Sequence, residues 1–108
     1  MAKFEYSPEN GDYIIIAPKT KDDMIEESRQ QSNCLSSYVS KVINGACYIF
    51  FMRKKDKPDK SLVTIEVLED GRLNQIKARY NYHPSTQQID FVHNWHKKKF
   101  ADFERIPL

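Results

Sequence analysis

The chain has 108 residues, of which 40% are hydrophobic and 30% are charged, and its mean hydropathy is −0.69. These values fit one soluble globular domain and exclude a membrane-embedded protein, because no apolar run approaches the roughly 20 residues that a spanning helix needs. With 17 basic and 15 acidic residues the net charge is only +2, so any nucleic-acid site must depend on a local cluster. The first residues lack the apolar core of a secretory signal, and we therefore expect a cytoplasmic protein.

The first half of the chain predicts a strand followed by helical segments. Residues 13–17 form a compact β-branched run, which is typical of a short strand. Thr20 and Asp23 have the spacing of a capping box, so a helix is expected to begin near Lys21. Apolar residues then recur at helical spacing at Leu35, Tyr38, Val39 and Val42. Gly45 suits the position just after the end of that second helical segment.

Three further strands are predicted after Gly45. Residues 46–52 are apolar on both alternating faces, which indicates a strand in the middle of a sheet that is covered on both sides. The dipeptide at residues 70–71, Asp-Gly, is a two-residue hairpin signal, and it pairs residues 62–68 with residues 73–79. The sequence therefore predicts a hairpin beside the central strand.

A last helix is predicted to begin after Ser85, because Ser85 and Gln88 have the spacing of a second capping box. The resulting order is strand, helix, three strands, helix. This order indicates an α+β fold with a mainly antiparallel sheet of about four strands and helices packed on it. We expect residues 1–108 to form one domain with a core at about residues 13–100.

One face of the predicted hairpin is polar. Side chains alternate along a strand, so this face carries Thr64, Glu66, Gln75 and Lys77. Glu66 and Gln75 are directly opposed, and Arg53 at the end of the preceding strand is a candidate bidentate partner for Glu66. Arg53, Glu66 and Gln75 are thus candidate catalytic or ligand-binding residues, with Glu66 as acid, base or anchor. The alternative is a solvated sheet face, which is common in antiparallel sheets.

Cys34 is a further catalytic candidate, because it lies at the predicted start of a helical turn, where backbone dipoles lower the pKa of a thiol. Catalysis would also need a base, and the sequence places none of His83, His93 and His96 beside it. The alternative is a small buried hydrophobe. His93 and His96 share a helix face, but no third ligand is indicated, so we predict no metal site and no cofactor.

Basic residues gather in two places along the sequence. Lys54 and Lys55 follow the central strand, and Lys97, Lys98 and Lys99 end the last helix. Lysines neutralise phosphates, and nearby aromatic residues supply stacking surfaces for bases. The candidate aromatic residues are Tyr80, Tyr82, Phe91 and Trp95. The alternative is a solvated loop and helix end, with Trp95 as a core anchor.

Several segments together resemble the PcfJ-like family of proteins. Residues 33–38 read NCLSSY and residues 48–53 read YIFFMR. They are followed in matching order and spacing by Thr64, Glu66, Gln75, Asn81 and Trp95. The resemblance covers about residues 13–95 and implies a context of conjugative plasmids, phages and other bacterial mobile elements. By the same resemblance, Tyr38, Thr64 and Asn81 are candidate ligand-binding positions.

The chain departs from the family pattern around its cysteine. The family usually has a histidine before the cysteine and a valine-glycine pair after it, where this chain has Asn33, Leu35 and Ser36. The neighbouring base of a Cys-His pair is therefore missing. Family members are commonly longer, so the chain resembles a C-terminal domain of the family or a short stand-alone version.

Three functions are compatible with these patterns. The first is a binding module for nucleic acid or a partner protein, which the basic clusters and the family context favour. The second is an enzyme or small-ligand-binding domain with a polar site around Arg53, Glu66 and Gln75. The third is a structural domain of a larger protein, in which those polar residues form a buried network that fixes the strand register.

Overall fold

The computed structural model describes residues 2–32 and 35–103. Its four-stranded sheet has the order β1-β2-β3-β4, and every neighbouring pair of strands is antiparallel. The strands are β1 (Tyr13–Ile16), β2 (Cys47–Lys54), β3 (Val63–Leu68) and β4 (Leu73–Lys77). The helices are α1 (Lys21–Gln31), α2 (Val39–Ile43) and α3 (Thr86–Lys99), with short 3-10 turns η1 (Ala2–Phe4), η2 (Leu35–Tyr38) and η3 (Arg79–Asn81). This arrangement confirms the predicted α+β fold and element order.

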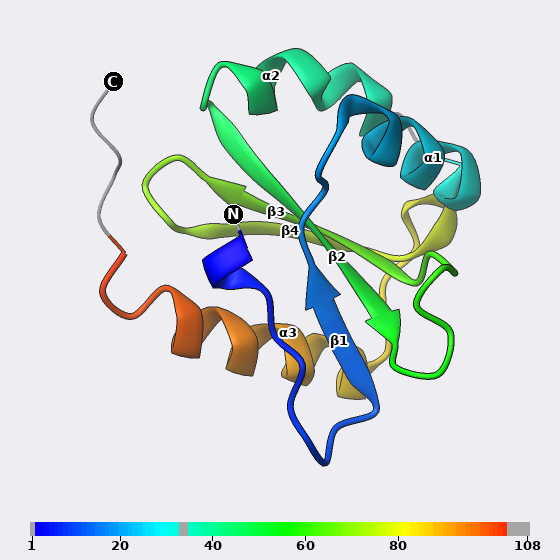
Figure 1. Ribbon diagram of the computed structural model, residues 1–108, viewed down its shortest axis with the longest axis vertical. Coiled ribbons are helices and arrows are strands. Elements are labelled where there is room, and N and C mark those ends of the chain that lie inside the picture. The colour runs from blue at the N-terminus through cyan, green and yellow to red at the C-terminus, as the bar shows by residue number, and fades with distance from the viewer. Residues whose placement is uncertain (1, 33–34, 104–108) are drawn as a thin grey trace.

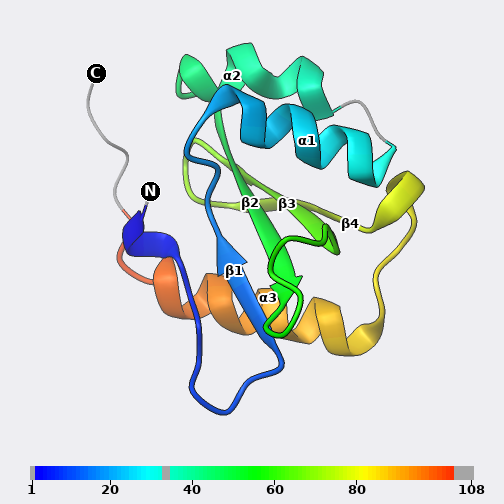
Figure 2. The ribbon, with the colours of Figure 1, turned by 45° about the vertical axis from the view of Figure 1, so that its right-hand side comes forward.

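The sheet lies between two helical layers. Figures 1 and 2 show α1 and α2 on one side of it and α3 on the other. The larger core lies on the α3 side and contains Phe50, Met52, Trp95 and other buried residues. The smaller core lies under α1 and α2 and contains Met24, Ile49 and Phe51. Residues of β2 point alternately into the two cores, which explains why this strand is apolar on both faces. Every helix in the described ranges is too short or too polar to span a bilayer.

The helix ends follow the signals in the sequence. Thr20 and Asp23 form a capping box at the start of α1, and Ser85 and Gln88 form one at the start of α3. At the end of α2, the Ala46 N–H donates to the Lys41 carbonyl and the Gly45 N–H donates to the Val42 carbonyl. These two bonds form a Schellman motif that needs a left-handed residue, and Gly45 has φ +75°.

The hairpin differs from the prediction at its turn. Glu66 pairs with Gln75 as predicted, but Val67 pairs with Leu73, so the register shifts by one residue between them. The Leu68 N–H donates to the Arg72 carbonyl, which leaves a three-residue loop instead of a two-residue turn. Gly71 supplies the positive φ of +90° that such a loop requires, and the extra residue at position 74 restores the predicted register.

The polar face of the hairpin is covered on β3. Thr64 is 7% exposed and Glu66 is 9% exposed, because α1 and α2 pack over this face of the sheet. Gln75 on β4, in contrast, is exposed. A fully solvated sheet face is therefore wrong for β3, where polar groups must find partners inside the protein.

Candidate functional site

Arg53 forms a buried ion pair with a residue that the sequence analysis missed. The Arg53 Nη2 atom lies 2.7 Å from Glu27 Oε1, and the two side chains are 9% and 0% exposed. The predicted partner, Glu66, instead lies opposite Ile49, four residues along β2 from Arg53. At about 3.3 Å per residue this is about 13 Å along the strand, which is too far for an ion pair. The expected pairing of Arg53 with Glu66 is therefore corrected to Arg53 with Glu27.

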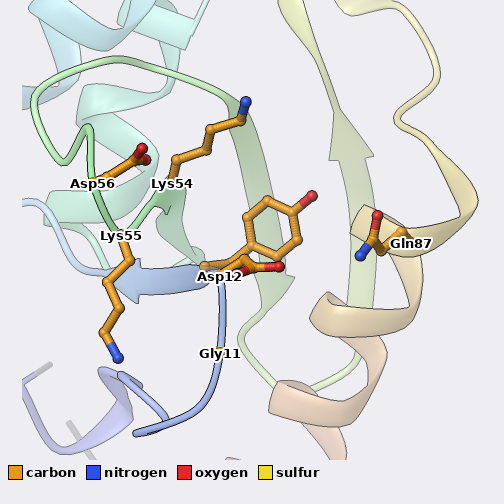
Figure 3. Close-up of a pocket in the computed structure, with 7 residues that line it drawn as sticks. Gly11, Asp12, Lys54, Lys55, Asp56 and Gln87 are labelled. Atoms are coloured by element: carbon orange, nitrogen blue, oxygen red, sulfur yellow. The ribbon is translucent and has the colours of Figure 1, made fainter.

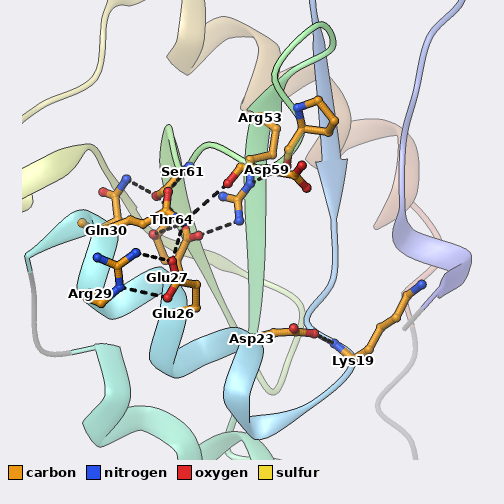
Figure 4. Close-up of polar contacts among 12 residues, drawn as sticks. Lys19, Asp23, Glu26, Glu27, Arg29, Gln30, Arg53, Asp59, Ser61 and Thr64 are labelled. Carbon is orange, nitrogen blue, oxygen red and sulfur yellow. Dashed lines mark hydrogen bonds and ion pairs between the residues drawn. The ribbon is translucent and has the colours of Figure 1, made fainter.

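Glu27 is the centre of a polar network between α1 and the sheet. Figure 4 shows Arg53, Ser61 and Thr64 converging on its carboxylate. The hydroxyls of Ser61 and Thr64 donate to Glu27 Oε2 over 2.9 and 3.1 Å. The Gln31 amide donates to Ser61, and Arg53 Nε donates to the carbonyl of Pro58 over 3.1 Å. The network thereby ties the loop between β2 and β3 to α1.

The position of Glu27 could be read from the sequence only indirectly. The buried residues of α1 are Met24, Glu27, Ser28 and Gln31. They have the i, i+3, i+4, i+7 spacing of a buried helix face, although only Met24 is apolar. A search for apolar periodicity therefore misses this helix face. The signal in the sequence is that Glu27, Ser28 and Gln31 follow Met24 at helical spacing.

Glu66 belongs to a separate cluster at the other end of the sheet. Its Oε1 accepts a hydrogen bond of 2.6 Å from Asn74 Nδ2. Burial raises the pKa of the Cys47 thiol to about 11, and the nearby Glu66 carboxylate adds to the shift. Such a thiol is protonated and poorly nucleophilic at neutral pH. Arg53, Glu66 and Gln75 thus do not form one site in the structure.

The other candidate residues lie apart from one another. Cys34 falls outside the described residues. Tyr38 packs against the smaller core, with the Lys41 ammonium 4.6 Å from its ring centre. Asn81 is exposed in η3 and has φ +60°. Trp95 is fully buried and donates a hydrogen bond of 2.7 Å to the Phe4 carbonyl, so it is a core residue.

No metal site can be built from the described residues, since no three of their His, Cys, Asp and Glu side chains lie together suitably. His96 Nε2 lies 2.7 Å from the Gly71 carbonyl, and its ring stacks on Phe100. This histidine therefore contributes to packing beside the hairpin turn.

Lysines and aromatic rings form a continuous series of contacts along α3, in which the half-buried rings of Tyr6, Tyr13 and Phe91 also pack against the larger core. The ammonium groups of Lys98 and Lys99 lie 5.6 and 5.8 Å from the ring centre of Tyr6. The Tyr6 ring contacts Phe91, whose other neighbour is Tyr13, with centroid distances of 5.7 and 5.3 Å. Tyr13 pairs across the strands with Lys54. We call Tyr6, Tyr13, Phe91, Lys54, Lys98 and Lys99 the lysine–aromatic strip.

The two remaining predicted lysines contribute less. The Lys55 ammonium is bound within the protein, because its Nζ donates to the carbonyls of Pro8 and Glu9 over 2.6 and 3.3 Å. Lys97 is exposed in the last turn of α3. Tyr6 and Tyr13 were missed by the sequence analysis, because they come from distant segments that only the fold brings to α3.

Two open recesses border these groups. One of about 580 Å³ lies at the Lys54 end of the strip, and Tyr13, Lys54 and Gln87 are among its lining residues (Figure 3). The other, of about 400 Å³, lies beside Phe51 and Arg53 and is bordered by the carboxylates of Glu5, Asp23, Glu26 and Asp59. Hydrogen bonds from Arg29 and then Gln30 to the Glu26 carboxylate hold its pKa low, at about 2.

Comparison with known proteins places the chain in a family. The model of the PcfJ-like protein family matches residues 2–92. An uncharacterized protein of Listeria innocua serovar 6a is 32% identical over 85 residues, which cover 77% of this chain and 18% of that protein. The chain thus spans about a fifth of the length of this relative. No solved structure matches the chain. Because the family match covers most of its length, the chain belongs to the PcfJ-like protein family.

Proposed function

We propose that this chain is a nucleic-acid-binding module whose contact surface is the lysine–aromatic strip. The observation that carries the proposal is the unbroken chain of contacts from Lys98 and Lys99 through Tyr6, Phe91 and Tyr13. Tyr13 pairs in turn with Lys54, so lysines stand at both ends of the aromatic rings. Ammonium groups neutralise phosphates, while aromatic rings stack on bases regardless of sequence.

The length of the strip suits a nucleic-acid backbone. Gln87, beside Lys54 in the recess, and Lys98 are eleven residues apart on α3, which is about 16 Å along the helix axis. Successive phosphates of one strand lie only a few ångströms apart along its axis, so the strip spans several of them. Because the net charge is only +2, affinity must come from these local groups and not from the overall field of the protein.

The test is the binding of a fluorescent oligonucleotide, followed by anisotropy as salt is raised from about 50 to about 200 mM. We expect affinity to fall steeply with salt. Replacing both lysines (Lys98→Glu and Lys99→Glu) should weaken binding and reduce the slope of log K against log salt by about two, one for each lost phosphate contact. The matched control carries Lys21→Glu and Lys60→Glu, which make the same charge change at exposed lysines outside the strip.

An equal loss of affinity in the two double variants would show a general effect of charge and would contradict the strip as the contact surface. Absence of binding to single-stranded and double-stranded DNA and to RNA at low salt would refute the proposed function.

The family resemblance further supports a role of this binding in plasmid or phage biology.

A further inference from the structure

We infer that the recess at the Lys54 end of the strip receives an unstacked base, so that the ligand is single-stranded nucleic acid. This inference rests on the proposed function and names its substrate class. The recess has a volume of about 580 Å³, which lies in the range of small-molecule sites. Its lining residues are Gly11, Asp12, Tyr13, Lys54, Lys55, Asp56 and Gln87.

The charges around the recess favour a base over a phosphate. The recess is lined by two acidic residues, Asp12 and Asp56, and by two basic ones, Lys54 and Lys55, so its formal charges cancel. The Lys55 ammonium is already bound to backbone carbonyls. Figure 3 shows Lys55 turned toward the loop before β1, while Lys54 and Gln87 approach the recess from β2 and α3. A phosphate inside would meet two carboxylates and one available ammonium. It is therefore better placed at the rim, beside Lys54.

The remaining groups have the chemistry that a base requires. Tyr13 is half-buried, and its ring is supported from one side by Phe91 at an angle of 63°. An aromatic ring held in this way offers a stacking surface at little entropic cost. The Gln87 amide both donates and accepts hydrogen bonds, and the Asp12 carboxylate accepts them from amino and imino groups on a base edge. A base in a duplex is stacked and paired, so only an unpaired base can enter.

The experiment compares three probes with the whole chain: a mixed-sequence single strand of about twelve nucleotides, its duplex, and a single strand of equal length without bases. We expect the base-containing single strand to bind about tenfold more tightly than the other two probes. A free nucleoside monophosphate should bind at least about tenfold more weakly than the strand, since it lacks contacts along the strip.

Two variants locate the effect. Tyr13→Leu should weaken binding of the base-containing single strand about tenfold and leave binding of the baseless strand unchanged. Gln87 is exposed, so Gln87→Ala keeps the fold and should weaken binding of the same probe, by about threefold to tenfold for a lost hydrogen bond. The control is Tyr82→Leu, because Tyr82 is 70% exposed and does not line the recess. Thermal unfolding of each variant verifies that the protein is folded at the assay temperature.

Equal binding of all three probes, with affinity that still depends on Lys98 and Lys99, would overturn the base site and leave the proposed function standing. An equal loss from Tyr82→Leu and Tyr13→Leu would also overturn it, as would a free nucleotide that binds as tightly as the strand. Absence of binding by every probe would refute the proposed function itself.

Discussion

At the scale of single residues, the contacts of Glu27 explain how Arg53 and Thr64 can lie buried in this sheet. Glu27 accepts from Ser61 and Thr64 as well as facing Arg53, so its charge is held inside the protein by several partners. Arg53 Nη1 is buried and has no hydrogen-bond partner among the described atoms. Removing one member of a buried pair is strongly destabilising, because the other charge then stays buried without a partner. The structural reading of the polar residues therefore applies to Arg53 and Thr64.

Glu27→Gln should lower the free energy of unfolding by about 3 kcal/mol, because it leaves the Arg53 charge buried without a counter-ion. Urea denaturation measures this change. The control is Glu26→Gln on the same helix, where Glu26 forms an exposed pair with Arg29 and its loss should move the midpoint little.

Replacing both members (Glu27→Met and Arg53→Met) should recover most of the stability lost in Glu27→Gln, because neither charge is then buried alone. The single variants Glu27→Met and Arg53→Met complete the comparison. A double variant whose loss of stability equals the sum of these two losses would show that the groups do not interact. Such additivity would contradict the ion pair.

Cys47 offers a pH-dependent test of the second polar cluster. Burial and then the charge of Glu66 raise the pKa of its thiol to about 11, so the native state holds this proton more tightly than the unfolded chain, in which the pKa is about 8.5. In a chain with Cys34→Ser, alkylation of Cys47 should be on the order of 100-fold slower at neutral pH than in the denatured protein. The rate should rise with pH until about 11.

Glu66→Gln removes a negative charge that opposes the thiolate, so it should lower the pKa of Cys47 and speed alkylation. An inflection near 8.5 in the native protein would contradict both the burial of this thiol and its contact with Glu66. Because the native state binds this proton more tightly than the unfolded chain, the proton contributes to the free energy of unfolding. This contribution is complete below about pH 8.5 and is lost as the pH rises toward 11.

At the scale of elements, two glycines with positive φ give a matched comparison. A methyl group on Gly71 would lie 2.7 Å from the Phe103 ring, whereas one on Gly45 would meet no atom within 4 Å. Gly45→Ala should cost about 1 kcal/mol for the left-handed backbone alone. Gly71→Ala should cost about 1–3 kcal/mol more, because it also overfills the space beneath Phe103.

Thermal or urea unfolding of the two variants measures the difference. Phe103→Ala introduced together with Gly71→Ala should recover part of the loss, since it removes the clash. Equal costs for the two glycine substitutions would mean that Phe103 does not pack on the hairpin turn.

Elements whose signals are local were predictable from the sequence. The capping boxes at Thr20 and Ser85 and the glycine after α2 mark helix ends through contacts between near neighbours. The turn signal correctly predicted the pairing of Glu66 with Gln75. It did not predict the extra residue at Asn74, because the longer loop and the bulge shift the register by one residue in opposite directions.

Contacts between distant segments were not predictable. Glu27 and Arg53 are 26 residues apart, and their pairing depends on how α1 crosses the sheet. Tyr6 reaches α3 because the first segment pairs with β1, where the Tyr6 and Ile15 backbones exchange two hydrogen bonds. The lysines at the end of α3 and Phe91 could be named from the sequence, but Tyr6, the ring that these lysines contact, comes from the other end of the chain.

At the scale of the whole molecule, the two faces have different characters. The side of α1 and α2 buries the polar network (Figure 4), while the side of α3 carries the lysine–aromatic strip and, at its end, the recess shown in Figure 3. The sheet thus separates the buried network of Glu27 from the strip that we propose as a ligand surface, and the larger core lies on the same side as the strip. The Listeria relative contains the matched region within a much longer chain, so this face is the one to test in longer family members.

A two-dimensional amide NMR spectrum of the chain, recorded as a single-stranded oligonucleotide is added at low salt, shows directly which residues the ligand contacts. If the strip is the contact surface, the largest shift changes will occur at Tyr6, Tyr13, Phe91, Lys98 and their neighbours, with little change at Met24 of α1 and Val42 of α2. Largest changes on the α1 and α2 side, or no change at any amide, would contradict the account.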